Sequence, residues 1–187
     1  MSIRFCTSAV FPAPPDRVAA IAWDERFRDE LCARLRVESL REYYFRDTTE
    51  AIELKYEVIV KRTLPDWVRR VIGDIRIGYI SEERFDKHSR VLEAKMVSQA
   101  LADRIGGAGR WMITELPGGM TQREYCGELW IDVPLVGGRM ERGLAATIER
   151  DYARSNELIA EWVARDREAL ACGRPLLELH QPRPLGA

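Results

Sequence analysis

The stretch VPLVGGRMERG, Val133–Gly143, separates two kinds of hydrophobic pattern. Before it, apolar residues recur at every second position, as they do in β-strands with one buried face. After it, they recur at every third or fourth position, as they do along one side of a helix. We expect Gly137 and Gly138 to let the chain leave the last strand and turn back tightly. The stretch therefore predicts a sheet that is followed by one long helix.

The predicted helix runs from about Val136 to Ala171 and ends before Gly173 and Pro175. At 1.5 Å per residue its length is on the order of 50 Å. One side carries an apolar stripe, formed by Met140, Leu144, Ile148, Tyr152, Ser155, Ile159 and Trp162. The opposite side carries charged residues that we expect to face solvent: Glu141, Arg142, Glu149, Arg150 and Glu157.

Seven strands are predicted upstream of this helix. The clearest is AIELKYEVIVKR, residues 51–62, in which apolar and charged residues alternate as in an antiparallel strand with one buried side. The others are expected within residues 2–11, 37–46, 74–85, 89–99, 107–116 and 120–133. Pro117-Gly118-Gly119 predicts the turn between the last two. Between the first and second strands, Pro14 and Pro15 favour the start of one short helix and Asp24 the start of another.

The composition argues against several classes of protein. The chain has 187 residues, with 29 Lys and Arg against 30 Asp and Glu, and a net charge of −1 disfavours a nucleic-acid-binding protein. No apolar run approaches the roughly 18–20 residues of a membrane span, and the N-terminus lacks the pattern of a signal peptide. We expect one cytoplasmic domain over residues 1–172, followed by a Pro-containing tail over residues 173–187.

Neither the cysteines nor the histidines form a motif that predicts chemistry. The four cysteines are far apart and include no CxxC pair: Cys6, Cys32, Cys126 and Cys172. We expect them to be small, buried or half-buried apolar residues. His88 and His180 lie outside any metal-binding motif. The sequence therefore predicts no metal site and no cofactor.

The order of elements is strand, two helices, two strands, a short helix, four strands and a long helix. This order, together with APPDRVAAIAWDERFRDEL at residues 13–31, resembles the helix-grip or START-like (SRPBCC) superfamily over residues 2–171. That superfamily includes START-type lipid-transfer domains, the birch-pollen-allergen class and bacterial polyketide cyclases, and the chain looks most like a bacterial branch. The resemblance implies an α+β helix-grip fold, in which a seven-stranded curved antiparallel sheet wraps around the C-terminal helix. It also implies a cavity between them for a hydrophobic molecule.

The wall of that cavity should come from inward-facing positions of the strands and of the long helix. The residues expected to contact a ligand are Tyr56, Val58, Ile77, Tyr79, Met96, Tyr125, Leu129, Ile131, Met140, Leu144, Ile148 and Tyr152. Each of them also suits plain core packing. In the last strand, Cys126 and Trp130 compete with Tyr125 and Leu129 for the inward face. Tyrosines suit such a wall because each buries a ring and offers a hydroxyl.

In proteins of this superfamily, the connection between the third and fourth strands often forms a gate. Here LPDWVRRVIGD predicts a short amphipathic helix over residues 65–73. We expect Trp67, Val71 and Ile72 to cover the entrance of the cavity; the alternative is a surface helix that serves stability. Arginines flank the tryptophan, a pattern that also suits transient contact with a membrane surface: Arg62, Arg69 and Arg70.

Glu83 is the first candidate for an acid or base. If the alternation of Ile75, Ile77, Tyr79 and Ser81 continues, Glu83 points inward near the rim, where burial would raise its pKa. The alternative is a rim carboxylate that pairs with an arginine such as Arg84 or Arg123. The catalytic candidates are Glu83, Tyr79, Tyr125 and Arg123. Their spacing supports no specific mechanism.

Three functions follow as hypotheses. The first is non-enzymatic binding or transfer of a hydrophobic, lipid-like small molecule. The alternative is a cyclase- or dehydratase-type enzyme that acts on a polyketide-like hydrophobic substrate, and it requires an acid or base in the cavity. The third is an interaction module whose groove binds another protein, which predicts a cavity too small for a ligand. The sequence predicts no oligomeric state.

Overall fold

The structure is a computed structural model and describes residues 2–61, 66, 69–70, 73, 76–102, 104–133, 137–173 and 176–177. In chain order its elements are β1 (Ser2–Phe11), α1 (Pro15–Trp23), α2 (Glu25–Arg34), β2 (Val37–Asp47), β3 (Ala51–Val60), β4 (Gly78–Asp86), β5 (Val91–Ser98), β6 (Ile105–Leu116), β7 (Met120–Ile131) and α4 (Gly137–Ala171). The seven strands, the two early helices and the long final helix confirm the predicted fold class. β4 begins later than expected, although the Ile77 carbonyl already accepts a hydrogen bond from the Val60 N–H at 3.0 Å.

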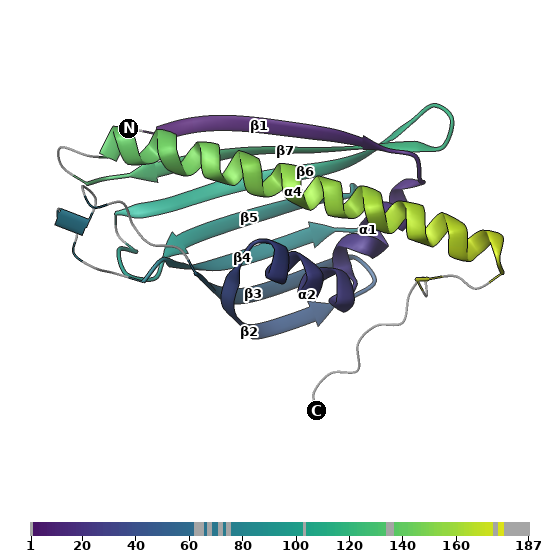
Figure 1. The fold of residues 1–187 in the computed structure, drawn as a ribbon, viewed down its shortest axis with the longest axis horizontal. Helices are drawn as coiled ribbons and strands as arrows, with labels where there is room; N and C mark the ends of the chain where they lie inside the picture. The colour runs from purple at the N-terminus through teal and green to yellow at the C-terminus, as the bar shows by residue number, and fades with distance from the viewer. Residues whose placement is uncertain are drawn as a thin grey trace.

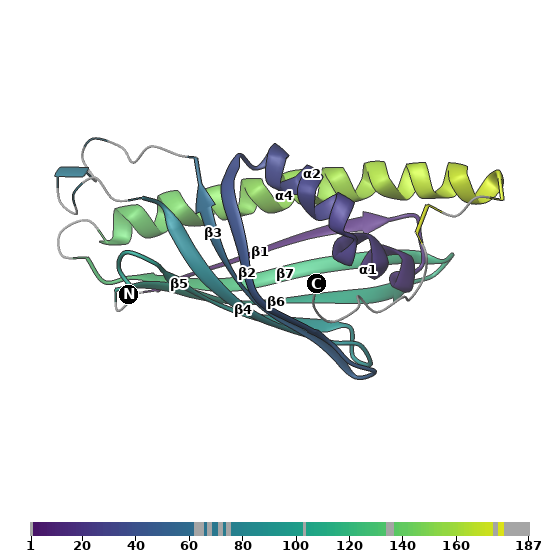
Figure 2. The ribbon, with the colours of Figure 1, turned by 90° about the horizontal axis from the view of Figure 1, so that it is seen from below.

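The strands form one antiparallel sheet in the order β1-β7-β6-β5-β4-β3-β2, with β1 and β2 at the edges. The sheet bends so that its concave side faces α4 (Figures 1 and 2). α4 runs along this side and packs closely against β1, β7, α1 and α2. Because α4 lies against one edge of the sheet and the early helices, space is left between it and the middle strands.

The two halves of the apolar stripe of α4 pack against different surroundings. Its C-terminal half packs into a solid core with α1, α2 and the end of β1, whose buried members include Phe11, Val18, Ile21, Phe27, Leu158, Ile159, Trp162 and Val163. Leu177 of the tail joins this core and is 3% exposed. The N-terminal half of the stripe is only half-buried, above a second cluster on the sheet. One end of the helix therefore closes a core, and the other end covers a hollow.

The first turn of α4 differs from the expectation in one respect. A Cβ at Gly137 would lie 2.5 Å from the Ile131 carbonyl oxygen, so glycine permits close approach of the helix to the end of β7. Glu141, expected to face solvent, is buried at 5% exposure. Its Oε1 accepts a hydrogen bond from the Ile131 N–H at 3.0 Å. The expectation was wrong because the helix begins directly over the strand end, where a carboxylate satisfies a buried backbone donor.

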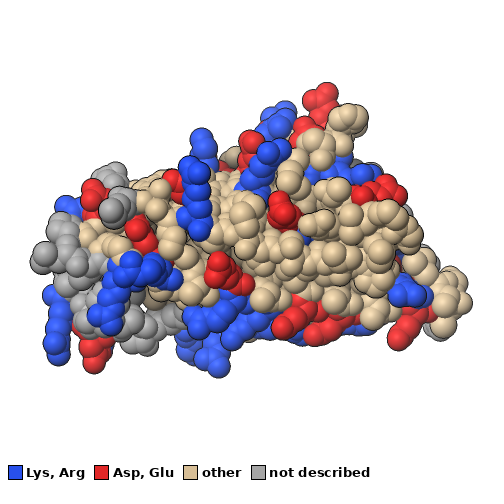
Figure 3. All heavy atoms as spheres, turned by 90° about the horizontal axis from the view of Figure 1, so that it is seen from above, with Lys and Arg blue, Asp and Glu red and all other residues tan. Residues whose placement is uncertain are grey.

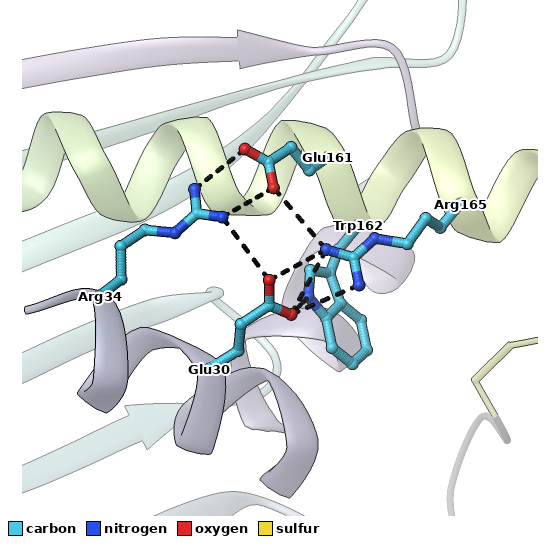
Figure 4. A network of polar contacts seen from close by, with 5 residues as sticks. All are labelled: Glu30, Arg34, Glu161, Trp162 and Arg165. Carbon is cyan, nitrogen blue, oxygen red and sulfur yellow. Dashed lines mark hydrogen bonds and ion pairs between the residues drawn. The ribbon is translucent and has the colours of Figure 1, made fainter.

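The early helices are tied to α4 by polar contacts. Asp24 caps α2, since its Oδ1 accepts a hydrogen bond from the Arg26 N–H at 2.9 Å. Glu30 accepts a hydrogen bond from the Trp162 indole Nε1 at 2.9 Å (Figure 4). In the same network, Arg34 pairs with Glu161 at 2.8 Å and Arg165 with Glu30 at 3.2 Å. These contacts hold α2 against the C-terminal half of α4.

Three of the cysteines contradict the expectation that they are small, buried or half-buried apolar residues. Cys6 and Cys126 are directly opposite on β1 and β7, with their Cα atoms 4.2 Å apart, and form a disulfide. They lie on the outer face, because Phe5 and Tyr125, their chain neighbours, are buried on the inner face. The pairing could not be predicted from the sequence because the two cysteines are 120 residues apart. Cys32 is half-buried and Cys172 is exposed.

On the face that Figure 3 shows, both signs of charge occur beside a broad uncharged area. No helix in the part of the chain that the structure describes is long and apolar enough to cross a membrane.

Candidate functional site

A cavity of about 1800 Å³ lies between the N-terminal half of α4, the early helices and the inner face of the sheet. If a water-sized group takes roughly 30 Å³, this volume holds on the order of 60 such groups. Ligand sites commonly span roughly 300–1000 Å³, so the space suits a large or elongated molecule.

All twelve residues that were expected to contact a ligand line this cavity. They come from β3, β4, β5, β7 and α4 and from Ile77 just before β4. In β7, Tyr125 and Leu129 are buried on the inner face at 2% and 4% exposure, whereas Trp130 points outward. The strand therefore has a single inward face, and contact with a ligand remains a prediction. The residues of the expected gate, Trp67, Val71 and Ile72, lie outside the described residues.

A row of small residues crosses the middle strands beneath the aromatic rings of the cavity floor. In neighbouring strands, Glu83 is opposite Ala94, Ala94 opposite Gly109, and Gly109 opposite Gly127. A Cβ at Gly109 would lie 2.1 Å from the Tyr125 hydroxyl oxygen. A Cβ at Gly127 would lie 2.8 Å from the ring of Phe5. The glycines thus make room for aromatic rings that lie flat on the sheet, a pattern that the sequence analysis did not use.

Glu83 lies deep in the cavity and not at its rim. Its carboxylate accepts a short hydrogen bond from the Tyr56 hydroxyl and another from the Ser81 hydroxyl at 3.1 Å. Burial raises the pKa of Glu83, although both hydrogen bonds and the charge of Arg123 oppose this shift. Arg84 pairs with Glu53 at 3.3 Å on the outer face, so the expected pairing with Arg84 was wrong. The result is a protonatable carboxyl held by two hydroxyls inside an apolar cavity.

The tyrosines around Glu83 are neutral. Burial and the nearby charge of Glu83 raise the pKa of the Tyr79 phenol, and the same causes raise the pKa of Tyr56. The rings of Tyr125 and Tyr152 stack with their centroids 3.9 Å apart, and burial raises the pKa of both phenols. The Tyr56 hydroxyl already donates to Glu83, and none of these phenols is a base near neutral pH.

Arg123 is the cation closest to this cluster. It is 7% exposed, and its Nη1 donates a hydrogen bond to Asn156 Oδ1 at 2.7 Å. Its guanidinium lies 4.8 Å from the ring centre of Trp111 and 5.7 Å from that of Tyr152. Burial lowers the pKa of Arg123, which nevertheless stays protonated because an arginine in a protein keeps its proton.

Trp23 is a cavity residue that the sequence analysis missed. It is the last residue of α1 and lines the cavity. The centre of its ring lies 5.7 Å from that of Phe85 and 6.4 Å from that of Trp111. Its indole Nε1 is buried, and the described residues offer it no hydrogen-bond partner. A tryptophan at the end of a short helix was the only available signal. Within the described ranges, no group of three or more His, Cys, Asp or Glu side chains is placed to hold a metal ion.

The curved sheet and the helix that it grips define a helix-grip fold. Solved structures with this fold include the Zhui aromatase/cyclase from Streptomyces sp. R1128, which is 14% identical and aligns over 91% of this chain and 98% of its own, with a TM-score of 0.63. TTHA0849 from Thermus thermophilus is 18% identical over 87% and 98% of the two chains, with a TM-score of 0.61. Ara h 8.0201 is 11% identical over 88% and 99%, with a TM-score of 0.59.

The family follows from a sequence model. The model described as "Protein of unknown function (DUF2505)" matches residues 7–163, and the chain belongs to this family. A search of curated proteins found no match. At these identities, the solved structures establish the fold and leave the activity to be argued from the cavity.

Proposed function

We propose that the protein binds or transfers a hydrophobic, lipid-like small molecule in the cavity beneath α4. The observation that carries this proposal is a cavity of about 1800 Å³ whose wall is mainly apolar and aromatic, with charged residues among its lining. In this proposal the twelve lining residues predicted from the sequence form the contacts.

The energetics favour such a ligand. Each buried methylene contributes roughly 0.8 kcal/mol, so a chain of about twelve carbons gains on the order of 10 kcal/mol before the cost of association. An interaction module, by contrast, predicts a cavity too small for a ligand, and the observed volume argues against it. Delivery through transient contact with a membrane surface belongs to the same proposal, with no nucleic acid as partner.

A second candidate function is a cyclase- or dehydratase-type enzyme for a polyketide-like substrate. The observation that favours it is Glu83, whose pKa is raised by burial and which receives a hydrogen bond from Tyr56. A carboxyl in this state can donate or accept a proton. The named aromatase/cyclase activity belongs to the Streptomyces protein and supports this candidate only through the shared fold. Turnover of a polyketide-like substrate that disappears in Glu83→Gln would favour the enzyme over the binding protein.

Mass spectrometry of an organic extract tests the proposed function. The protein is purified natively from its own host, beside the variant Ala94→Trp, which places a large ring on the cavity floor, and Lys95→Trp, which places it on the exposed outer face. We expect one apolar species near one equivalent in the wild type and in Lys95→Trp, and much less in Ala94→Trp. Equal amounts in all three proteins would contradict binding in the cavity.

The proposed location is the cytoplasm, and the disulfide provides its test. Disulfides are rare in the cytosol because thiols are kept reduced there. We therefore expect rapid alkylation of intact cells to trap Cys6 and Cys126 as free thiols. Recovery of the oxidised pair would place the protein in an oxidising compartment instead.

A further inference from the structure

Most of the cationic residues that line the cavity interact with other groups of this chain, and Arg123 is the buried one among them. Four cationic residues of the lining each pair with a carboxylate: Arg28 with Glu42, Arg76 with Glu38, Lys87 with Asp47 and Arg90 with Asp16. Arg123 also lines the cavity and is 7% exposed. No ion pair between described residues includes it.

Two acidic residues of the cavity lining have other partners on this chain. Glu83 accepts hydrogen bonds from Tyr56 and Ser81. Asp151, which also lines the cavity, lies 3.8 Å from Arg154. An unpaired buried charge is costly, and buried charges in proteins are normally paired. Among the described residues, no carboxylate lies within ion-pair distance of the Arg123 guanidinium. Glu83 is the carboxyl whose charge acts on it, and burial favours the protonated form of that carboxyl.

The surroundings of Arg123 leave one side of it for a ligand. Its Nη1 donates to Asn156, and the rings of Trp111 and Tyr152 lie over the guanidinium. Its Nε is buried and has no hydrogen-bond partner among the described residues. Arg123 lines the cavity, so a molecule inside it can supply an acceptor to the guanidinium N–H groups that no described residue accepts from. Arginine presents its N–H groups in a planar fork, which matches the two oxygens of a carboxylate.

We infer that the ligand is a hydrophobic carboxylic acid, whose carboxylate binds the guanidinium of Arg123 and whose apolar chain fills the cavity. This inference rests on the proposed function, because it names the chemical class of the molecule that the same cavity binds. A single negative charge suits the site better than the double charge of a phosphate monoester, since one cation faces it and the carboxyl of Glu83 lies in the same cavity.

Displacement of a neutral fluorophore, N-phenyl-1-naphthylamine, separates the inference from the proposed function. The competitors share one chain length: dodecanoate, methyl dodecanoate and dodecyl phosphate, all below their solubility limits. Because a hydrogen bond to a charged group contributes roughly 1.5–3 kcal/mol, we expect dodecanoate to bind at least tenfold more tightly than its methyl ester. Dodecyl phosphate should bind less tightly than dodecanoate.

Two variants assign the preference to the residue. In Arg123→Met the acid and the ester should bind within about twofold of each other, because the charged hydrogen bond is lost. Arg110→Met, on the exposed side of β6, should keep the wild-type preference. If Arg123→Met does not fold, the comparison of acid and ester on the wild type still decides.

The outcomes differ for the two claims. If the fluorophore binds and both the acid and the ester displace it equally, the inference fails and the proposed function stands. A preference for the acid that persists in Arg123→Met also overturns the inference, and tighter binding of dodecyl phosphate overturns the choice of a carboxylate. If neither the fluorophore nor any alkyl compound binds, the proposed function itself fails.

Discussion

Replacing Gly109 by alanine should disturb both stability and the cavity floor. The new Cβ would lie 2.1 Å from the hydroxyl oxygen of Tyr125 and 2.6 Å from its Cζ, so the ring must move. Tyr125 is 2% exposed and stacks on Tyr152, which leaves it little room. Overpacking costs about 1–3 kcal/mol, and loss of the stack adds roughly 0.5–1.5 kcal/mol. Alanine also reduces the conformational freedom of the unfolded chain, which offsets about 0.4–1 kcal/mol of this destabilisation.

The expected net loss is therefore about 0.5–4 kcal/mol in the free energy of unfolding. For a chain of this size each kcal/mol lowers Tm by roughly 2–4 °C. Urea denaturation measures the loss, and titration with N-phenyl-1-naphthylamine measures the change in the cavity. Gly143→Ala is the matched control, because nothing lies within 4 Å of the new Cβ on α4. It should be neutral or stabilise by up to about 1 kcal/mol.

A double-mutant cycle tests the cause. Tyr125→Leu removes the atoms that collide with the new Cβ, so Gly109→Ala should cost less in that background than in the wild type. We expect a coupling energy of at least about 1 kcal/mol, because the two side chains are in direct contact. Strictly additive effects, or an unchanged free energy of unfolding in Gly109→Ala, would refute the reasoning.

The remaining predictions concern three other contacts. Asp166 and Arg17 form an ion pair in which their side chains are 5% and 11% exposed, and Asp166→Ala should therefore lower the free energy of unfolding by about 3–5 kcal/mol in urea denaturation. Asp166→Leu combined with Arg17→Leu should recover much of this loss. A full loss in the double variant would contradict this explanation. Burial raises the pKa of Glu83 above its ordinary value of 4.5, so the stability from its protonated form is present below pH 4.5 and is lost as pH rises through the folded pKa. Glu83→Gln should therefore gain stability relative to the wild type as pH rises from about 4.5, and a pH-independent difference in urea denaturation would show that the carboxyl is not perturbed. The Cys6–Cys126 disulfide closes a long loop, so reduction should cost about 2–4 kcal/mol in the wild type and nothing in the variant with serine at both positions, as thermal unfolding with and without dithiothreitol would show.

Much of the fold was predictable because each element carries its own periodic pattern. The alternation in β3 and the helical stripe of α4 are local signals, and both elements appear within a few residues of their predicted limits. The inward positions followed from the same alternation, which is why the predicted wall residues line the cavity. Because side chains alternate between the two faces of a strand, the inward position of Tyr125 also determines which other residues of β7 face the cavity.

The errors came from contacts between segments that are distant in sequence. The Cys6–Cys126 disulfide depends on the register of β1 with β7, which no local pattern encodes. Glu141 carries a charge at a position that looks exposed, but the end of β7 supplies a backbone donor for it. The position of Glu83 between Tyr56 and Ser81 likewise depends on the pairing of β3 with β4. Periodicity predicts which way a residue faces, whereas its partners are set by tertiary structure.

The central claim is that the cavity under α4 takes up an apolar molecule. The most direct test is the titration of N-phenyl-1-naphthylamine into the wild type, Ala94→Trp and Lys95→Trp, after each variant is shown to unfold cooperatively. Ala94 lies on the cavity floor, and Lys95, its chain neighbour, is exposed on the outer face. We predict saturable binding near one equivalent in the wild type and in Lys95→Trp, with affinity at least tenfold lower in Ala94→Trp, because the added ring occupies the cavity. Equal binding by all three proteins, or no saturable binding by any, would contradict the claim.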